Sequence, residues 1–179
     1  MWRISHRADY EARVIADRHY NRQKPGTPQF VPPGRCVVLV CKGAVWVTSW
    51  PFAEYVKHEW AGAWVNSCFR REPDCPYLAS DLVKEAIAIT RWVWPDVPAL
   101  GMVTFIDRGK VKRKRDFGRC YRKAGFKVCG ETKGKLLALQ ISPEDMPQPL
   151  IPTASTTDSR KELECVAPPE LETQHAAGK

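Results

Sequence analysis

The stretch from Gly101 to Phe126 reads GMVTFIDRGKVKRKRDFGRCYRKAGF and decides the fold that we expect for this chain. It begins as an apolar run of strand length that ends at a carboxylate, Asp107. A loop dense in Lys and Arg follows, and then a short helical segment, Phe117 to Ala124, which carries Tyr121. A strand, an acid, a cationic loop and a tyrosine helix in close succession predict a site that handles an anionic polymer.

The flanking sequence supplies the other elements of an α/β domain. Helical spacing predicts a first helix from Asp9, its N-cap, to Tyr20, and a longer helix from Ser80, also read as a cap, to about Trp94. The segment Asn21 to Pro33 is rich in Pro and Gly and is expected to form an ordered loop or a flap. Strands are predicted at Cys36–Cys41, Ala44–Trp50, Ala61–Phe69, Leu100–Ile106, Lys127–Cys129 and Leu136–Ile141. This order predicts a mixed central sheet flanked by helices.

The formal net charge of +8 is unevenly spread along the chain. Of the 28 basic and 20 acidic residues, the segment 143–179 holds three and seven. That leaves 25 bases and 13 acids, a net charge of +12, in residues 1–142. We therefore expect residues 1–142 to form a domain that favours polyanions, of which nucleic acid is the commonest, and composition alone leaves DNA, RNA and a phosphorylated small molecule open. Residues 143–179, rich in Pro and acids, are expected to form a disordered tail.

The composition also excludes several classes of protein. No apolar run approaches the ~20 residues that span a bilayer, and the start, MWRISHRADY, lacks a signal-peptide stretch. We therefore expect a soluble, cytoplasmic protein with no membrane partner. The seven cysteines are odd in number and contain no CxxC pair, so buried free thiols are expected, with neither disulfides nor a metal site.

The order of elements, together with RCYRKAGF at residues 119–126, resembles the Gcn5-related N-acetyltransferase (GNAT) superfamily. Many members carry such a segment on their final helix, with the tyrosine facing the acyl group. The resemblance covers roughly residues 8 to 142 and implies a GNAT-like fold. One feature departs from that pattern: the connection Arg70–Ala79, where GNAT enzymes hold coenzyme A with a Gly-rich turn, contains no glycine. Acetyl-CoA is therefore one possible acyl donor, and the donor stays unknown.

A narrower resemblance is to the phage Mom-like DNA-modification proteins, which are diverged GNAT relatives. The residues that carry it are His19-Tyr20, Thr104 to Asp107, Gly118, Tyr121 and Gly130-x-Thr132, in the order of that family. The resemblance implies transfer of a carbamoylmethyl-like group to the exocyclic amine of adenine in DNA. It also implies that the catalytic residues are Asp107, Tyr121, His19 and Tyr20.

Each of these candidates also has a structural interpretation. Asp107 fits a general base or a turn cap, and Tyr121 fits a group that donates a proton or orients an acyl carbonyl, or a core residue. His19 fits a general base or a partner for a helix dipole. Four tryptophans (Trp46, Trp50, Trp60 and Trp64) fit a stacking platform for a flipped base, and core packing is the stronger expectation for most of them.

Two further groups complete the predicted site. Asn66 and Ser67 interrupt the third strand, so they either face a cleft or lie at an exposed edge, and together with Ser80 they are candidates for binding the donor. The nucleic-acid-binding candidates are the cations of the loop and helix, Lys110, Lys112, Arg113, Lys114, Arg115, Arg119 and Arg122.

These residues leave three functions open. The first is a nucleic-acid-modifying transferase that adds a small acyl-derived group to a base amine. The second is a GNAT N-acetyltransferase that uses acetyl-CoA on a small-molecule or protein amine. The third is a DNA-binding module without catalysis. The oligomeric state is not predicted.

Overall fold

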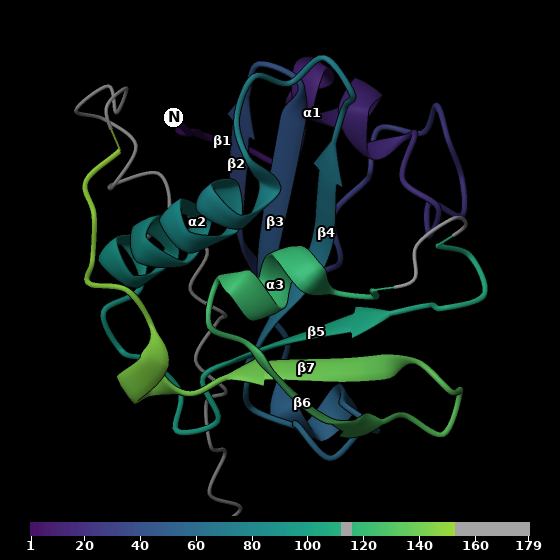
Figure 1. The fold of residues 1–179 in the computed structure, drawn as a ribbon. Coiled ribbons are helices and arrows are strands. Elements are labelled where there is room, and N and C mark those ends of the chain that lie inside the picture. Colours follow the sequence, from purple (N-terminus) through teal and green to yellow (C-terminus); the bar gives the residue numbers. More distant parts are fainter. Residues whose placement is uncertain (112–115, 153–179) are drawn as a thin grey trace, which may run out of the picture.

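The computed structural model describes residues 1–111 and 116–152, and Figure 1 shows their arrangement around one seven-stranded sheet. The sheet order is β1-β2-β3-β4-β5-β7-β6. Every pair of neighbouring strands is antiparallel except β4 and β5, which are parallel and are joined through a helix. The strands are β1 (Arg3–Ser5), β2 (Arg35–Cys41), β3 (Ala44–Trp50), β4 (Trp64–Arg71), β5 (Met102–Ile106), β6 (Lys127–Glu131) and β7 (Leu137–Ile141). The helices are α1 (Tyr10–Ala16), α2 (Ala79–Val93) and α3 (Arg119–Lys123), with 3-10 turns at Ala53–Tyr55 and Pro143–Asp145.

The helices lie on both faces of the sheet, as the α/β expectation requires. In Figure 1, α2 and α3 lie in front of the sheet and α1 lies behind it. Along β2, Val37 and Leu39 pack into the core under α2 and α3, whereas Val38 and Val40 pack with α1. This alternation follows from the two-residue period of a strand, and it explains why β2 reads as one continuous apolar run.

The first helix is shorter than its periodicity predicts. Asp9 caps it as expected, with Oδ1 accepting from the Ala12 amide at 3.0 Å. The helix ends at Ala16 because the next carboxylate, Asp17, accepts hydrogen bonds from Arg22 at 2.6 Å and from the Gly26 amide at 2.9 Å. Those bonds begin the following loop.

Other elements also differ from the prediction. Helix α2 begins at Ala79 with Leu78 in the N-cap position and no side-chain cap, so the assignment of Ser80 as the cap is wrong. Strand β4 begins at Trp64 rather than Ala61, because the preceding residues form a turn in which Gly62 has a φ of 93°. Strand β1 was not predicted, since three residues are too short to show a period.

The expected boundary at residue 142 lies too early. Arg91 of α2 donates to the carbonyls of Met146 and Pro147, at 3.2 and 2.7 Å, and Leu150 donates its amide to Ala88 at 3.1 Å. Met146 is buried, so the chain packs along α2 as far as Leu150. The rest of the predicted tail, residues 153–179, lies outside the described residues. Within the described part of the chain, no helix is both long enough and apolar enough to cross a membrane.

Candidate active site

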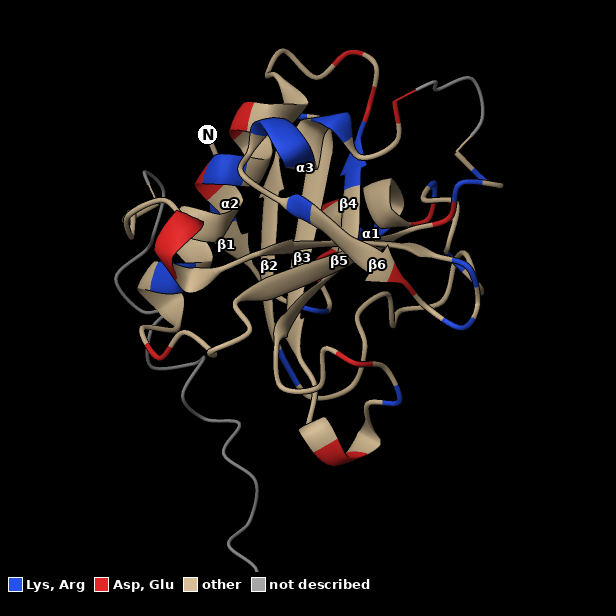
Figure 2. Cartoon of the chain, turned by 60° about the horizontal axis from the view of Figure 1, so that its bottom comes forward, with Lys and Arg blue, Asp and Glu red and all other residues tan. Residues whose placement is uncertain are grey.

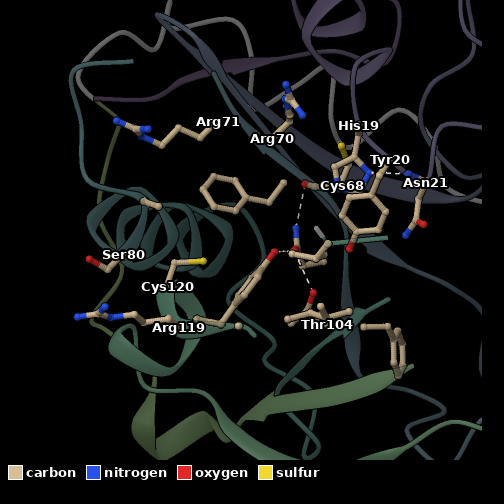
Figure 3. A pocket seen from close by; sticks show the side chains of 18 of the residues that line it. His19, Tyr20, Asn21, Cys68, Arg70, Arg71, Ser80, Thr104, Arg119 and Cys120 are labelled. Carbon is tan, nitrogen blue, oxygen red and sulfur yellow. Dashed lines mark hydrogen bonds between the residues drawn. The ribbon is translucent and has the colours of Figure 1, made fainter. Parts of the chain in front are cut away.

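A large cavity lies where β4 and β5 separate. The parallel pairing runs from Trp64–Met102 to Asn66–Thr104 and stops there, and a bulge at Ser67 shifts the register of β4 against β3. The opening holds a cavity of about 830 Å³ (Figure 3). The lining comes from β4, β5, α3, the start of α2 and the chain after α1. It includes His19, Tyr20, Asn21, Asn66, Ser67, Cys68, Phe69, Arg70, Arg71, Ser80, Thr104, Asp116, Arg119, Cys120, Tyr121 and Lys123.

Asn66 organises the floor of this cavity. Its buried Nδ2 donates to the carbonyls of Val47 at 3.1 Å and Cys68 at 3.0 Å, which uses both amide hydrogens. Its Oδ1 then accepts from Thr104 Oγ1 at 3.2 Å and from the Tyr121 hydroxyl at 2.7 Å. The side chain therefore joins β3, β4, β5 and α3 at the point where the strands part. Because these contacts are buried, Asn66 is held in one orientation. It does not lie at an exposed edge, which was the alternative expectation.

Tyr121 lies on α3 and is buried against Trp46, Phe69 and Phe126. Burial raises the pKa of its phenol well above the ordinary value, so the hydroxyl keeps its proton at neutral pH. The hydroxyl donates that proton to Asn66 in a hydrogen bond, so its oxygen can only accept any further hydrogen bond. In this arrangement Tyr121 is suited to accept a hydrogen bond from a ligand N–H or to orient a ligand.

His19 and Tyr20 follow α1 and stack on each other with ring centroids 4.3 Å apart. Burial, helped by the positive charge of Arg70, lowers the pKa of His19 to about 4. The ring is therefore neutral at pH 7. Its Nδ1 accepts from the Asn21 amide at 3.3 Å, which assigns the proton to Nε2 and makes that nitrogen a donor. In this state His19 can donate a hydrogen bond from Nε2 to a ligand, whereas Nδ1 is already occupied and is not free to act as a base.

Asp107 lies at the end of β5, as expected, just beyond the lining residue Ile106. Its Oδ1 accepts from the amides of Gly109 at 2.9 Å and Lys110 at 3.2 Å, which is the turn-cap arrangement. Asp107 also lies next to Tyr20: burial raises the pKa of Tyr20, a backbone hydrogen bond with Asp107 partly offsets this rise, and the negative charge of Asp107 adds a smaller rise. Asp107 thus caps a turn and neighbours the hydroxyl of a lining tyrosine.

The candidate donor-binding residues lie at different places in the cavity wall. Ser67 forms the bulge of β4, and its Oγ lies 3.0 Å from Ser49 Oγ. Ser80 lies in the first turn of α2, where no side chain caps the helix and Leu78, Ala79 and Ser80 line the cavity. Uncapped amides at the start of a 15-residue helix favour an anionic group nearby.

The glycine-free connection between β4 and α2 is held by Arg71. Its guanidinium donates to the carbonyls of Tyr77 at 2.7 Å and Cys75 at 2.5 Å, and more weakly to that of Glu72 at 3.4 Å. The guanidinium thus fixes the loop from within. Arg70, the preceding residue, forms an ion pair with Glu72 and lines the same cavity.

Cations gather on one side of the cavity. Figure 2 shows the Lys and Arg of α3 beside those at the end of β4. Arg119 is exposed and lines the cavity together with Lys123, and both Arg119 (at 4.0 Å) and Arg122 form ion pairs with Asp116. Lys110 is exposed, with Nζ 3.8 Å from Asp107. The other predicted nucleic-acid-binding residues, Lys112, Arg113, Lys114 and Arg115, lie outside the described residues.

Several lining residues were not among the sequence candidates. Thr104 was detectable, because a polar residue alternates with the apolar Val103 and Phe105 along a buried strand. Arg70, Asn21 and Asp116 carried no local signal, since only the separation of β4 from β5 and the return of α3 bring them together.

Core packing was the stronger expectation for these tryptophans, and it is confirmed for most of them. Trp46 and Trp64 are fully buried, Trp60 is nearly so, and Trp50 packs against the core beside Trp64. The six described cysteines are free thiols, and no cluster of three potential metal ligands forms among residues 1–111 and 116–152. Compared with protein-family models, curated proteins and solved structures, this chain matches none of them.

Proposed function

We propose that this protein is a nucleic-acid-modifying transferase that adds a small acyl-derived group, of the carbamoylmethyl type, to the exocyclic amine of adenine in DNA. The observation that carries the proposal is one open cavity that combines Tyr121, His19 and Tyr20 with a cationic rim. Polar side chains fixed by buried hydrogen bonds suit the orientation of a reacting group. Cations on the rim suit the phosphates that flank a target base.

The reaction is a substitution at the transferred carbon of an activated donor, whose identity stays open. The amine nitrogen forms the new N–C bond, and the bond from that carbon to the leaving group breaks with its electron pair. The amine loses one proton, and we assign its removal to Asp107, acting beside Tyr20. The amine extends past His19 toward Tyr121, which accepts a hydrogen bond from it, and neutral His19 donates one to the transferred group.

The principal alternative is an N-acetyltransferase that uses acetyl-CoA. The uncapped first turn of α2 in the cavity wall favours it, because helix amides bind phosphate groups. The connection before α2 supplies no glycine, and Arg71 holds three of its carbonyls. We therefore expect coenzyme A to bind weakly, and calorimetry with coenzyme A tests this alternative directly.

The test of the proposal is nucleoside mass spectrometry of DNA from cells that express the protein. A modified deoxyadenosine that is absent from cells without the gene is the expected result. If every digest contains ordinary nucleosides alone, the proposed transferase function is wrong. A DNA-binding module without catalysis would give that result and still bind DNA.

A further inference from the structure

A second cavity, of about 790 Å³, adjoins the first on the far side of the β4 bulge. The loop that follows α1, residues 21–33, forms its wall, and Cys68 lies at its floor. Four residues line both cavities: His19, Asn21, Ser67 and Cys68. The two cavities therefore border each other at His19 and at the bulge.

The wall of the second cavity is fixed by one arginine. Arg22 donates from Nε to Asp17 at 2.6 Å, from Nη1 to the Gln29 carbonyl at 2.7 Å and from Nη2 to the Thr27 carbonyl at 2.8 Å. Asp17 in turn accepts from the Gly26 amide. These bonds hold the two ends of the loop together, and Phe30 and Val31 anchor it in the core beside α1. The segment is thus an ordered wall, as the sequence allowed.

The lining of the second cavity is mostly neutral. Apolar and proline side chains form much of it, Arg22 is neutralised by Asp17, and Lys24 adds an exposed positive charge. Burial raises the pKa of Cys68 to about 12, so the thiol at the floor is uncharged. Among the described residues, the side-chain amides of Asn21 and Gln23 hydrogen-bond to no protein group. They offer paired donors and acceptors at a neutral surface.

We propose that this second cavity binds the target nucleobase, an adenine turned out of the stack, and that the first cavity binds the donor. An Asn or Gln side-chain amide can pair with N6 and N7 of adenine through two hydrogen bonds, one accepted and one donated. A phosphate offers only acceptors and cannot pair in this way. The cationic rim and the uncapped α2 terminus suit anionic groups instead. This assignment rests on the proposed function, because it identifies the cavity that holds the adenine to which the group is transferred.

Backbone NMR of the full chain separates base binding from phosphate binding. The probes are a short single-stranded oligonucleotide of deoxyadenosines and an abasic oligonucleotide of the same length. We expect the adenine oligonucleotide to shift the amide signals of both Arg119 and the 21–33 loop, and the abasic one to shift those near Arg119 alone. Asn21→Leu and Gln23→Leu should each weaken binding of the adenine oligonucleotide roughly 5-fold. Gln148→Leu, an exposed residue in neither cavity, is the matched control and should change nothing.

Two results overturn the assignment in different ways. If the adenine oligonucleotide shifts only the signals near Arg119, the second cavity is not the base site, and the transferase proposal stands on nucleoside mass spectrometry. If neither oligonucleotide shifts any signal, the chain does not bind DNA, and the base site fails together with DNA recognition. Equal shifts of the loop by both probes would assign it to the phosphate backbone and would also contradict the proposal.

Discussion

The hydroxyl of Tyr121 donates to Oδ1 of Asn66 at 2.7 Å, across 55 positions of sequence, and this bond ties α3 to the last residue of β4 that pairs with β5. Thr104 of β5 donates to the same oxygen. The two parallel strands and the tyrosine helix therefore meet at one amide at the floor of the cavity. Because that amide uses its own hydrogens on Val47 and Cys68, the phenol proton has one fixed direction.

Replacing Tyr121 with Phe tests the role of the phenol. The variant keeps the ring contacts with Trp46 and Phe69 and loses one hydrogen bond, so the free energy of unfolding should fall by about 1 kcal/mol. Transfer should fall by about 100-fold or more, because the group that orients the amine is absent. Urea unfolding and a nucleoside assay measure the two effects. An unchanged rate of transfer would show that Tyr121 takes no part in the reaction.

Asn66→Leu should cost far more stability than Thr104→Val. The leucine leaves the carbonyls of Val47 and Cys68 and the Tyr121 hydroxyl buried without partners, which should lower the free energy of unfolding by about 3 kcal/mol or more. The valine removes one of two donors to Oδ1 and should cost about 1 kcal/mol. Urea unfolding of both variants measures the difference. Equal losses would mean that Asn66 does not organise the floor.

The sequence predicted the elements well and the site only in part. The hairpin of β2 and β3 follows from two apolar runs around Lys42 and Gly43, which are local signals. The role of Asn66 could not be predicted, because its partners come from three other elements. The packing of residues 146–150 on α2 could not be predicted for a similar reason: two of its contacts are backbone carbonyls that accept from Arg91, and composition does not record them.

His19 should make the fold sensitive to acid. Its folded pKa of about 4 lies below the unfolded value near 6.5, so the unfolded chain binds the proton more tightly. The stability is full above about pH 6.5 and falls as the pH drops toward 4, by on the order of 2 kcal/mol from this residue. Carboxylates titrate in the same pH range, so the contribution of His19 has to be measured by comparing the wild type with a variant that lacks this histidine.

His19→Gln provides that comparison, because the amide is close to imidazole in size and does not titrate. Urea unfolding of the two proteins at several pH values should show the wild type gaining stability relative to the variant as the pH rises from about 4 to 6.5, and a constant difference above that pH. Parallel curves between pH 4 and pH 7 would contradict a buried, neutral His19.

Removing cations from the rim should weaken DNA binding in a salt-dependent way. Arg119→Gln combined with Lys123→Gln removes two lining charges, and each lost phosphate contact should lower the slope of log K against log salt by about 1. Lys57→Gln is the control, since that residue is exposed and lines neither cavity. Fluorescence anisotropy over a range of salt concentrations measures the slopes. Equal slopes for the double variant and the wild type would exclude these residues from the DNA contact.

Nucleoside mass spectrometry on DNA from cells that express the wild type, Tyr121→Phe or Lys57→Gln tests the central proposal most directly. We predict a modified deoxyadenosine with the wild type and with Lys57→Gln, and a loss of most of it with Tyr121→Phe at equal protein levels. Ordinary nucleosides in all three samples, with the proteins folded and present, would contradict the proposed transferase.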